Sequence, residues 1–210
     1  SWQGPLPEAP QVRACGFGKV RFDLHPSWDR PRHAEAVREA QSRIRAGDFY
    51  VANLCIPFTG PCTGDILTLA LAAFRQARPP FGALLPGPEL TLLSLSMERL
   101  LSRRGRRLRT EPIKGSAPLE APPGALATDP KEHAEHTMIV DLQRNDLGRI
   151  STPGTVRVPR LRVEEDFPTV RHLVSTVEGE LREGLGLPDI LRAMLPGGSV
   201  TGAPKHAVCE

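Results

Sequence analysis

The feature that most constrains this sequence is a long helix expected over residues 130–147. Asp129 is suited to cap its first turn, Pro130 to occupy the first helical position, and Glu132 to stand three residues after the cap. Gly148 is expected to end the helix. Strand-like stretches follow one another on both sides of this helix, without the strict alternation of strand and helix that builds a parallel sheet. The sequence therefore predicts an α+β fold with a largely antiparallel sheet.

Apolar residues at helical spacing predict two further helices, over residues 31–46 and 66–76, and a short third one over residues 188–195. Strands are expected over residues 49–58, 90–96, 100–101, 108–113, 155–163 and 173–181. Residues 1–30 are proline-rich and weakly patterned, so we expect them to be the tail of an upstream segment.

The composition argues against several classes of protein. A formal net charge of +3 gives no reason to expect a nucleic-acid partner. The four cysteines are scattered without a metal-type spacing, so we expect reduced thiols. The apolar stretch 66–74 is too short to span a bilayer, and the first residues lack the basic and hydrophobic regions of a signal peptide. We therefore expect a cytoplasmic protein with no nucleic-acid or membrane partner.

The helix over residues 130–147 carries Glu132 and Glu135 three residues apart, so that both carboxylates project from nearly the same face. Two carboxylates without a cysteine suit Mg²⁺ rather than zinc. His133 and His136 lie beside them, but they do not form the H-E-x-x-H zinc motif in register. A structural interpretation stays open for both glutamates: Glu132 can belong to a capping box, and Glu135 can lie on a solvated face.

A glycine-rich turn spans Pro196–Lys205. Gly197 and Gly202 have the G-x₄-G spacing of a P-loop, but Ala203 stands where that motif requires lysine. Backbone N–H groups can converge on an anion at such a turn, and a carboxylate serves as well as a phosphate. A purely structural turn is the alternative.

Lysine is rare in this chain, because only four of the 27 lysine and arginine residues are lysines. Lys114 directly follows a predicted strand; in a buried setting its amine becomes a nucleophile, whereas on the surface it is only a solvated charge. Glu98 presents the same pair of alternatives, an exposed carboxylate or a general acid in an apolar pocket.

The order of these motifs resembles that of a known family. Five strings occur in family order across residues 31–210: GDFYVANL from Gly47, EPIKGS from Glu111, the helix string from Asp129, RHLVS from Arg171, and PGGSVTGAPK from Pro196. They resemble the chorismate-binding enzymes, which include anthranilate, aminodeoxychorismate, isochorismate and salicylate synthases. Residues 31–210 are then expected to be the N-terminal and central part of a catalytic domain.

The resemblance implies a fold of two antiparallel sheets packed with outer helices, and an Mg²⁺-dependent site for chorismate. It implies Glu135 as a metal ligand, with Glu132 as a second ligand or near neighbour of the metal. It implies Glu98 as the general acid that protonates the departing ring hydroxyl, although Met97 replaces the proline of the family's S-P-E string. Substrate-binding roles are implied for Ser116, His172, Thr201, Gly202 and Lys205.

Lys114 indicates the branch of the family. Anthranilate synthases typically carry alanine at this position, and aminodeoxychorismate synthases carry lysine. The implied reaction is amination of chorismate at C4, with Lys114 attacking C2 and ammonia supplied by a glutamine amidotransferase subunit. Val51 stands where isochorismate and salicylate synthases have a catalytic lysine, which argues against both. An anthranilate synthase and a non-catalytic fragment remain the alternatives.

This chain departs from the family pattern in two further respects. Ser116 replaces the usual threonine, which keeps the hydroxyl, and Ala117-Pro118-Leu119 replaces an R-P-R stretch. The family also continues beyond the matched motifs into a segment with a second pair of metal-binding carboxylates. We therefore expect the domain to be incomplete in residues 1–210, and these residues alone to show no turnover.

Overall fold

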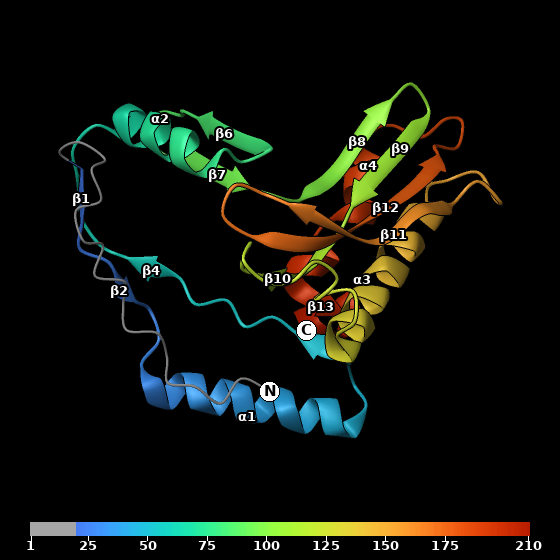
Figure 1. Cartoon of the computed structure of the whole chain (residues 1–210), viewed down its shortest axis with the longest axis horizontal. Helices are drawn as coiled ribbons and strands as arrows, with labels where there is room; N and C mark the ends of the chain where they lie inside the picture. Colours follow the sequence, from blue (N-terminus) through green and yellow to red (C-terminus); the bar gives the residue numbers. More distant parts are fainter. Residues whose placement is uncertain (1–19) are drawn as a thin grey trace. The chain divides into compact units, whose positions relative to one another are not determined.

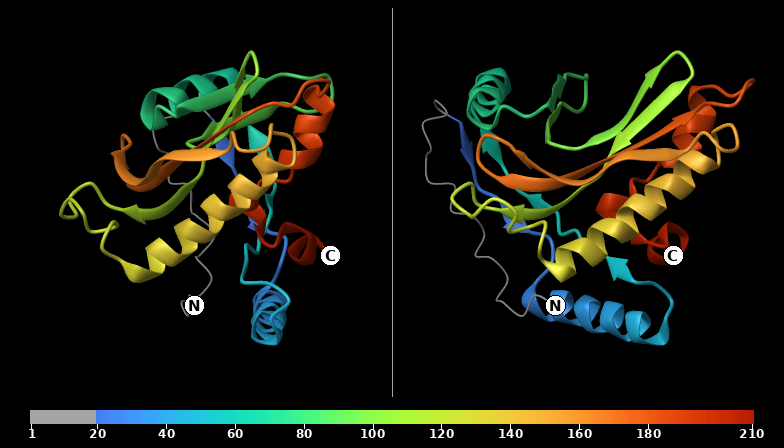
Figure 2. Two further views of the ribbon diagram at one scale, coloured as in Figure 1. Left: turned by 90° about the vertical axis from the view of Figure 1, so that its right-hand side faces the viewer. Right: turned by 45° about the vertical axis from the view of Figure 1, so that its right-hand side comes forward.

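The computed structural model describes residues 20–210 (Figures 1 and 2). Most of the predicted upstream tail, together with Cys15 and Lys19, lies outside the described residues. The chain forms two compact units, one built from residues up to 48 and from 53–95, the other from 49–52 and 96–210. No helix in the described part is long and apolar enough to cross a membrane.

The first unit contains two helices, each of which begins at an aspartate N-cap. Helix α1 (Arg30–Ala46) begins after Asp29, whose carboxylate accepts a hydrogen bond from the Arg32 N–H, and ends at Gly47 with φ 86°. Helix α2 (Ile66–Ala77) begins after Asp65, whose carboxylate accepts from two backbone N–H groups of the first turn. Both predicted helices are confirmed.

Three two-stranded ribbons accompany these helices. They are β1 (Arg21–Phe22) with β5 (Cys62–Thr63), β2 (His25–Pro26) with β4 (Phe58–Thr59), and β6 (Phe81–Leu85) with β7 (Leu92–Ser96). Strand β7 was predicted, whereas β1, β2, β5 and β6 were not. The single strand expected over residues 49–58 is wrong. Strand β3 (Val51–Ala52) pairs with β13 (Gly202–Ala203), whereas β4 pairs with β2, so the segment divides between two partners.

The second unit is organised around a five-stranded antiparallel sheet. Its central strand β12 pairs with β11 along one edge and with β9 and β10 along the other, and β8 pairs with β9. This arrangement confirms the predicted α+β class with antiparallel strands. The bounds are β8 (Arg99–Arg104), β9 (Arg107–Glu111), β10 (Ile113–Ala117), β11 (Arg157–Asp166) and β12 (Arg171–Glu180).

Helix α3 (Pro130–Gly148) lies along one face of this sheet, as the views in Figure 2 show, and α4 (Leu187–Met194) packs with it. Asp129 caps α3 as predicted, but Gly148 lies inside the helix and the C-cap is Arg149. Alternate residues of β12 point to α3, because side chains alternate along a strand. The buried core they form contains Leu108, Val140, Leu147, Ile150, Val177, Leu181, Ile190, Ala193 and Met194.

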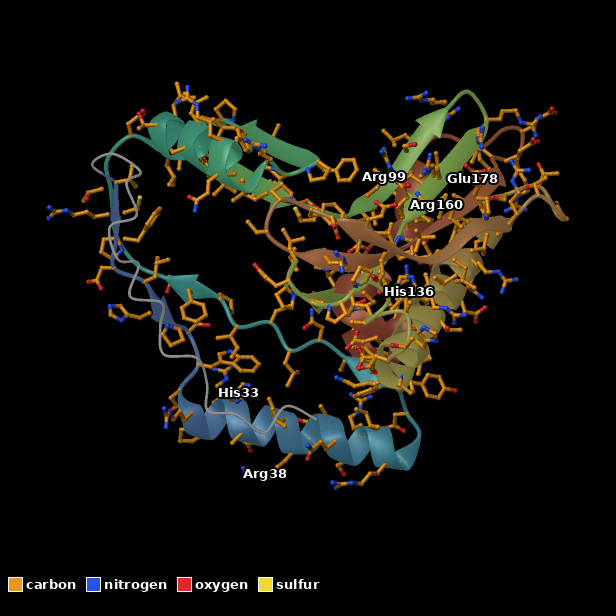
Figure 3. All side chains as sticks on the ribbon, in the orientation of Figure 1. His33, Arg38, Arg99, His136, Arg160 and Glu178 are labelled. Carbon is orange, nitrogen blue, oxygen red and sulfur yellow. The ribbon has the colours of Figure 1, made fainter. Side chains whose placement is uncertain are left out.

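The other face of the sheet is charged. Glu178 follows Val177 and is only 5% exposed, because Arg107 and Arg157 cover its carboxylate with hydrogen bonds of 2.8 and 3.2 Å. Figure 3 shows Glu178 on this sheet with Arg99, while His136 comes from α3. The sheet therefore separates an apolar layer that holds α3 from a layer of ion pairs.

Candidate active site

A bulge in β10 directs the side chains that the sequence singled out. Lys114 stands opposite Leu173 and Ser116 opposite His172, and the register shifts between them at Gly115, where φ is 71°. The bulge interrupts the regular alternation of side chains along β10 between Lys114 and Ser116.

Glycine is favoured at position 115. A left-handed φ disfavours any other residue, and a Cβ there would lie 3.1 Å from Oε2 of Glu132. The contact also locates the Glu132 carboxylate, which lies against β10 and not only at the end of its own helix.

Lys114, Glu98, Ser116 and His172 line one open cavity of about 400 Å³, so the structure brings four of the predicted site residues together. Strands β7, β10 and β12, the connection between β7 and β8, and the short helix α5 (Gly198–Thr201) contribute to its wall. The complete lining is Ser96, Met97, Glu98, Ile113, Lys114, Gly115, Ser116, His172 and Ser199.

Glu98 is a half-buried carboxyl whose pKa lies above its ordinary value, because burial disfavours the charged form. The Ser199 hydroxyl, the charge of Lys114 and the Ile113 N–H act in the opposite direction and do not outweigh burial. The Ser96 hydroxyl oxygen accepts from the Glu98 N–H at 3.2 Å and lies 3.1 Å from the Glu98 carbonyl oxygen. Ser96 therefore closes this turn although Met97 replaces proline.

The ring of His172 is fixed in one tautomer by its neighbours. Its Nδ1 lies 2.7 Å from the carbonyl oxygen of Gly115, and a carbonyl can only accept, so Nδ1 carries the hydrogen. The Ser116 hydroxyl oxygen lies 3.1 Å from the same nitrogen and shares that hydrogen. In its neutral form the ring then has an acceptor at Nε2, and the Ser116 O–H is left to donate elsewhere.

The remaining substrate-binding candidates of the glycine-rich turn do not line the cavity. The Thr201 hydroxyl donates to the carbonyl of Gly197 at 3.1 Å. Gly202 has φ 137°, and a Cβ there would collide with the Val51 carbonyl across the β13–β3 pair. The Lys205 amine donates to Oδ2 of Asp146 at 2.8 Å and to two carbonyls at the end of α4. In this structure all three residues shape the turn.

The metal candidates lie on the first turns of α3. Oε1 of Glu135 is 3.8 Å from Nζ of Lys131, and the Glu135 side chain is 38% exposed. Within residues 20–210 no three side chains of His, Cys, Asp or Glu converge as a metal site. Mg²⁺ usually takes only one or two protein carboxylates and keeps several waters, so Glu132 and Glu135 fit the chemistry of that ion.

Two features of the second unit escaped the sequence argument. Ser199 lies inside a recognised motif, but nothing in the sequence tells that it faces both Lys114 and Glu98. His136 is fully buried on α3, with Nε2 2.6 Å from the Ser175 hydroxyl, which in turn accepts from the Arg162 N–H at 2.8 Å. A histidine on the inner face of a helix gave only a weak signal for such a contact.

Comparisons with known proteins agree with this geometry. A model of the chorismate binding enzyme family matches residues 10–210. The chain is 44% identical over 200 residues to aminodeoxychorismate synthase component 1 of Klebsiella aerogenes, covering 90% of this chain and 44% of that protein. It is 42% identical over 216 residues to anthranilate synthase component 1 of Thermus thermophilus, covering 99% of this chain and 46% of that protein.

The crystal structure of anthranilate synthase component I from Streptococcus pneumoniae superimposes with a TM-score of 0.81 at 34% identity, over 89% of this chain and 42% of that one. This match confirms the fold that the sequence motifs implied. The chain spans less than half the length of each of these relatives.

Proposed function

This chain belongs to the chorismate binding enzyme family, and on that premise we propose that it carries the reactive part of a site that aminates chorismate at C4 to give 4-amino-4-deoxychorismate. The observation that carries the proposal is the amine of Lys114, which lines the same cavity as the carboxyl of Glu98. A nucleophile and an acid in one cavity are the two groups that a covalent substitution needs.

In the proposed reaction, the side-chain nitrogen of Lys114 uses its lone pair to form a bond to ring carbon C2. The ring double bonds shift, the bond from C4 to its hydroxyl breaks, and Glu98 gives its proton so that the hydroxyl leaves as water. Ammonia then bonds to C4, the double bonds shift back, and the bond from C2 to Lys114 breaks. The ammonium group formed at C4 returns a proton to the Glu98 carboxylate. The adduct divides one difficult substitution into two displacements.

The elevated pKa of Glu98 supports its role as the acid, since a raised pKa keeps the proton at a pH where an ordinary carboxyl has lost it. His172 and Ser116 offer an acceptor and a hydroxyl donor to the polar groups of a chorismate molecule. They would orient the ring so that C2 faces the lysine.

Mg²⁺, held by Glu135 with Glu132 beside it, would neutralise a carboxylate of the substrate. The relatives are named as component 1 of their synthases, and we propose that a glutamine amidotransferase subunit supplies the ammonia.

Anthranilate synthase, which aminates C2, is the second candidate. Similar identities to relatives of both names support it, at 44% and 42%. Lys114 favours the C4 reaction, because an amine that occupies C2 leaves C4 as the carbon open to ammonia.

The test is product identification with the full-length protein, chorismate, Mg²⁺ and an ammonium salt. We expect 4-amino-4-deoxychorismate by chromatography and mass, and its loss in Lys114→Ala. Anthranilate as the main product, detected by its fluorescence, would replace the C4 proposal with the second candidate. Chorismate binding without either product would support a non-catalytic subunit.

A further inference from the structure

Ser199 lies between the two groups that the proposed reaction uses. Its backbone carbonyl accepts a hydrogen bond from Nζ of Lys114 at 3.2 Å. Its side-chain hydroxyl hydrogen-bonds the carboxyl of Glu98, and all three residues line the same cavity. One residue of α5 therefore contacts the amine through its backbone and the acid through its side chain.

We propose that Ser199 is a positioning residue that holds the carboxyl of Glu98 and the amine of Lys114 in register across the cavity. The inference rests on the proposed function for its catalytic consequence, but the two contacts do not depend on it. A hydroxyl that donates to Glu98 favours the carboxylate and sets the direction in which the acid presents its oxygen atoms. A carbonyl that accepts from Lys114 restricts an otherwise flexible side chain.

The turn that carries Ser199 is itself held in place. Gly198 is buried, and a Cβ there would collide with the side chain of Leu142 on α3, so the turn lies directly against that helix. Gly197 is different, because a Cβ there would meet Leu100 at 3.4 Å, an ordinary contact distance. The position of Ser199 is therefore set by packing on α3, which makes it suitable for orienting two other side chains.

The first experiment compares Ser199→Ala with Ser199→Thr in the full-length protein. The alanine variant removes the hydroxyl but keeps the carbonyl that Lys114 contacts, and the threonine variant keeps both. The titration of Glu98 is followed by carbon NMR of its carboxyl, with the signal assigned from Glu98→Gln. We expect Ser199→Ala to move the midpoint upward by roughly half a pH unit to one unit, and Ser199→Thr to restore it.

Kinetics provide a second readout. A residue that orients the acid acts in the transition state, so Ser199→Ala is expected to lower kcat by about tenfold with little change in KM. An unchanged Glu98 titration in Ser199→Ala would overturn the inference, whatever the activity. A shifted titration in a protein that makes no aminated product would keep the inference and remove the proposed function. The two failures are therefore distinguishable.

A pair of glycine variants tests the lysine contact. Gly198→Ala should displace the turn and release the Lys114 amine, whereas Gly197→Ala should leave it in place. The chain has only four lysines, so the labelling rate of each amine by an acylating reagent can be followed by mass spectrometry. We expect faster labelling of Lys114 in Gly198→Ala alone, reversed when Leu142→Ala makes room. Equal Lys114 labelling in both glycine variants would contradict the positioning of this amine by the turn.

Discussion

Nζ of Lys205 lies 2.8 Å from Oδ2 of Asp146, and this ion pair joins the end of the glycine-rich turn to the last turns of α3. Both side chains are largely buried, at 13% and 3% exposure. Burial raises the pKa of the Asp146 carboxyl, and Lys205 acts against that rise. The lysine also donates to the carbonyls of Ala193 and Met194, so it ties three segments together.

Removing one partner of this pair is predicted to destabilise the protein strongly. Lys205→Met leaves a buried carboxylate without its cation, and the loss of such a partner costs about 3 kcal/mol or more. Urea denaturation followed by circular dichroism measures it. Lys131→Met is the matched control, because its pair with Glu135 spans 3.8 Å with the lysine side chain 67% exposed. That control should change stability by less than about 1 kcal/mol, and equal losses in the two variants would contradict the prediction.

Lys114→Arg should abolish amination although it keeps the positive charge. A guanidinium stays protonated and has no free amine to bond to C2. Product formation is measured by chromatography in the presence of ammonium, with binding of chorismate measured separately by calorimetry. Retained turnover in the arginine variant would show that Lys114 acts only as a charge.

Glu98→Gln should lower kcat by about 10²- to 10⁴-fold, the usual contribution of a general acid. In the unmodified protein the acid must be protonated, and its pKa is raised above the ordinary carboxyl value by burial. The value of kcat should therefore fall as the pH rises through this raised pKa of Glu98, and not through the ordinary carboxyl pKa. A pH profile of kcat checks this, and an identical profile in Glu98→Gln would assign the fall in kcat to another group.

Glu135→Gln should weaken Mg²⁺-supported binding of chorismate, because the site loses an anionic ligand. Calorimetric titrations of chorismate with and without Mg²⁺ measure the effect. Asp141→Asn is a matched control on the same helix, since Asp141 pairs with the exposed Arg144 at 3.0 Å. An unchanged Mg²⁺ dependence in Glu135→Gln would leave Glu135 as a residue of a solvated face.

The local rules of helix formation predicted much of this fold. Asp129 caps the helix that the sequence assigned to it, because a cap depends on neighbouring residues alone. The strand predicted over residues 49–58 was wrong because strand pairing, unlike capping, depends on distant residues. Its residues have strand-like composition, but the partners of Val51 and Phe58 come from distant parts of the sequence.

The candidate site was also only partly predictable from the sequence. The motifs pointed to Lys114, Glu98, Ser116 and His172, and these four residues line one cavity. The contacts of Ser199 could not be predicted, because they depend on a bulge at Gly115 and on the packing of a turn against α3. Periodicity and spacing do not describe such contacts between distant segments.

His136 should make the stability of the fold sensitive to acid. Its pKa is lowered from 6.5 to about 4, first by burial and then by the charges of Arg162, Lys114 and His133. The folded state therefore holds this ring neutral, while the unfolded chain binds a proton below about pH 6.5. Stability contributed by His136 is fully present above pH 6.5 and is lost as pH falls towards 4, by about 3 kcal/mol in total.

Urea denaturation at a series of pH values between 7 and 4 measures this loss, with His136→Gln as the variant that cannot titrate. The glutamine amide can still hydrogen-bond the Ser175 hydroxyl, which the histidine reaches at 2.6 Å. The variant is expected to be less stable than the unmodified protein at pH 7, because the buried imidazole ring is lost from the core. It should lose less stability on acidification. His206→Gln is the control on an exposed histidine, paired with Glu210 at 3.0 Å with its side chain 87% exposed. A slope of stability against pH that is the same in His136→Gln as in the unmodified protein would show that another group is responsible for the acid sensitivity.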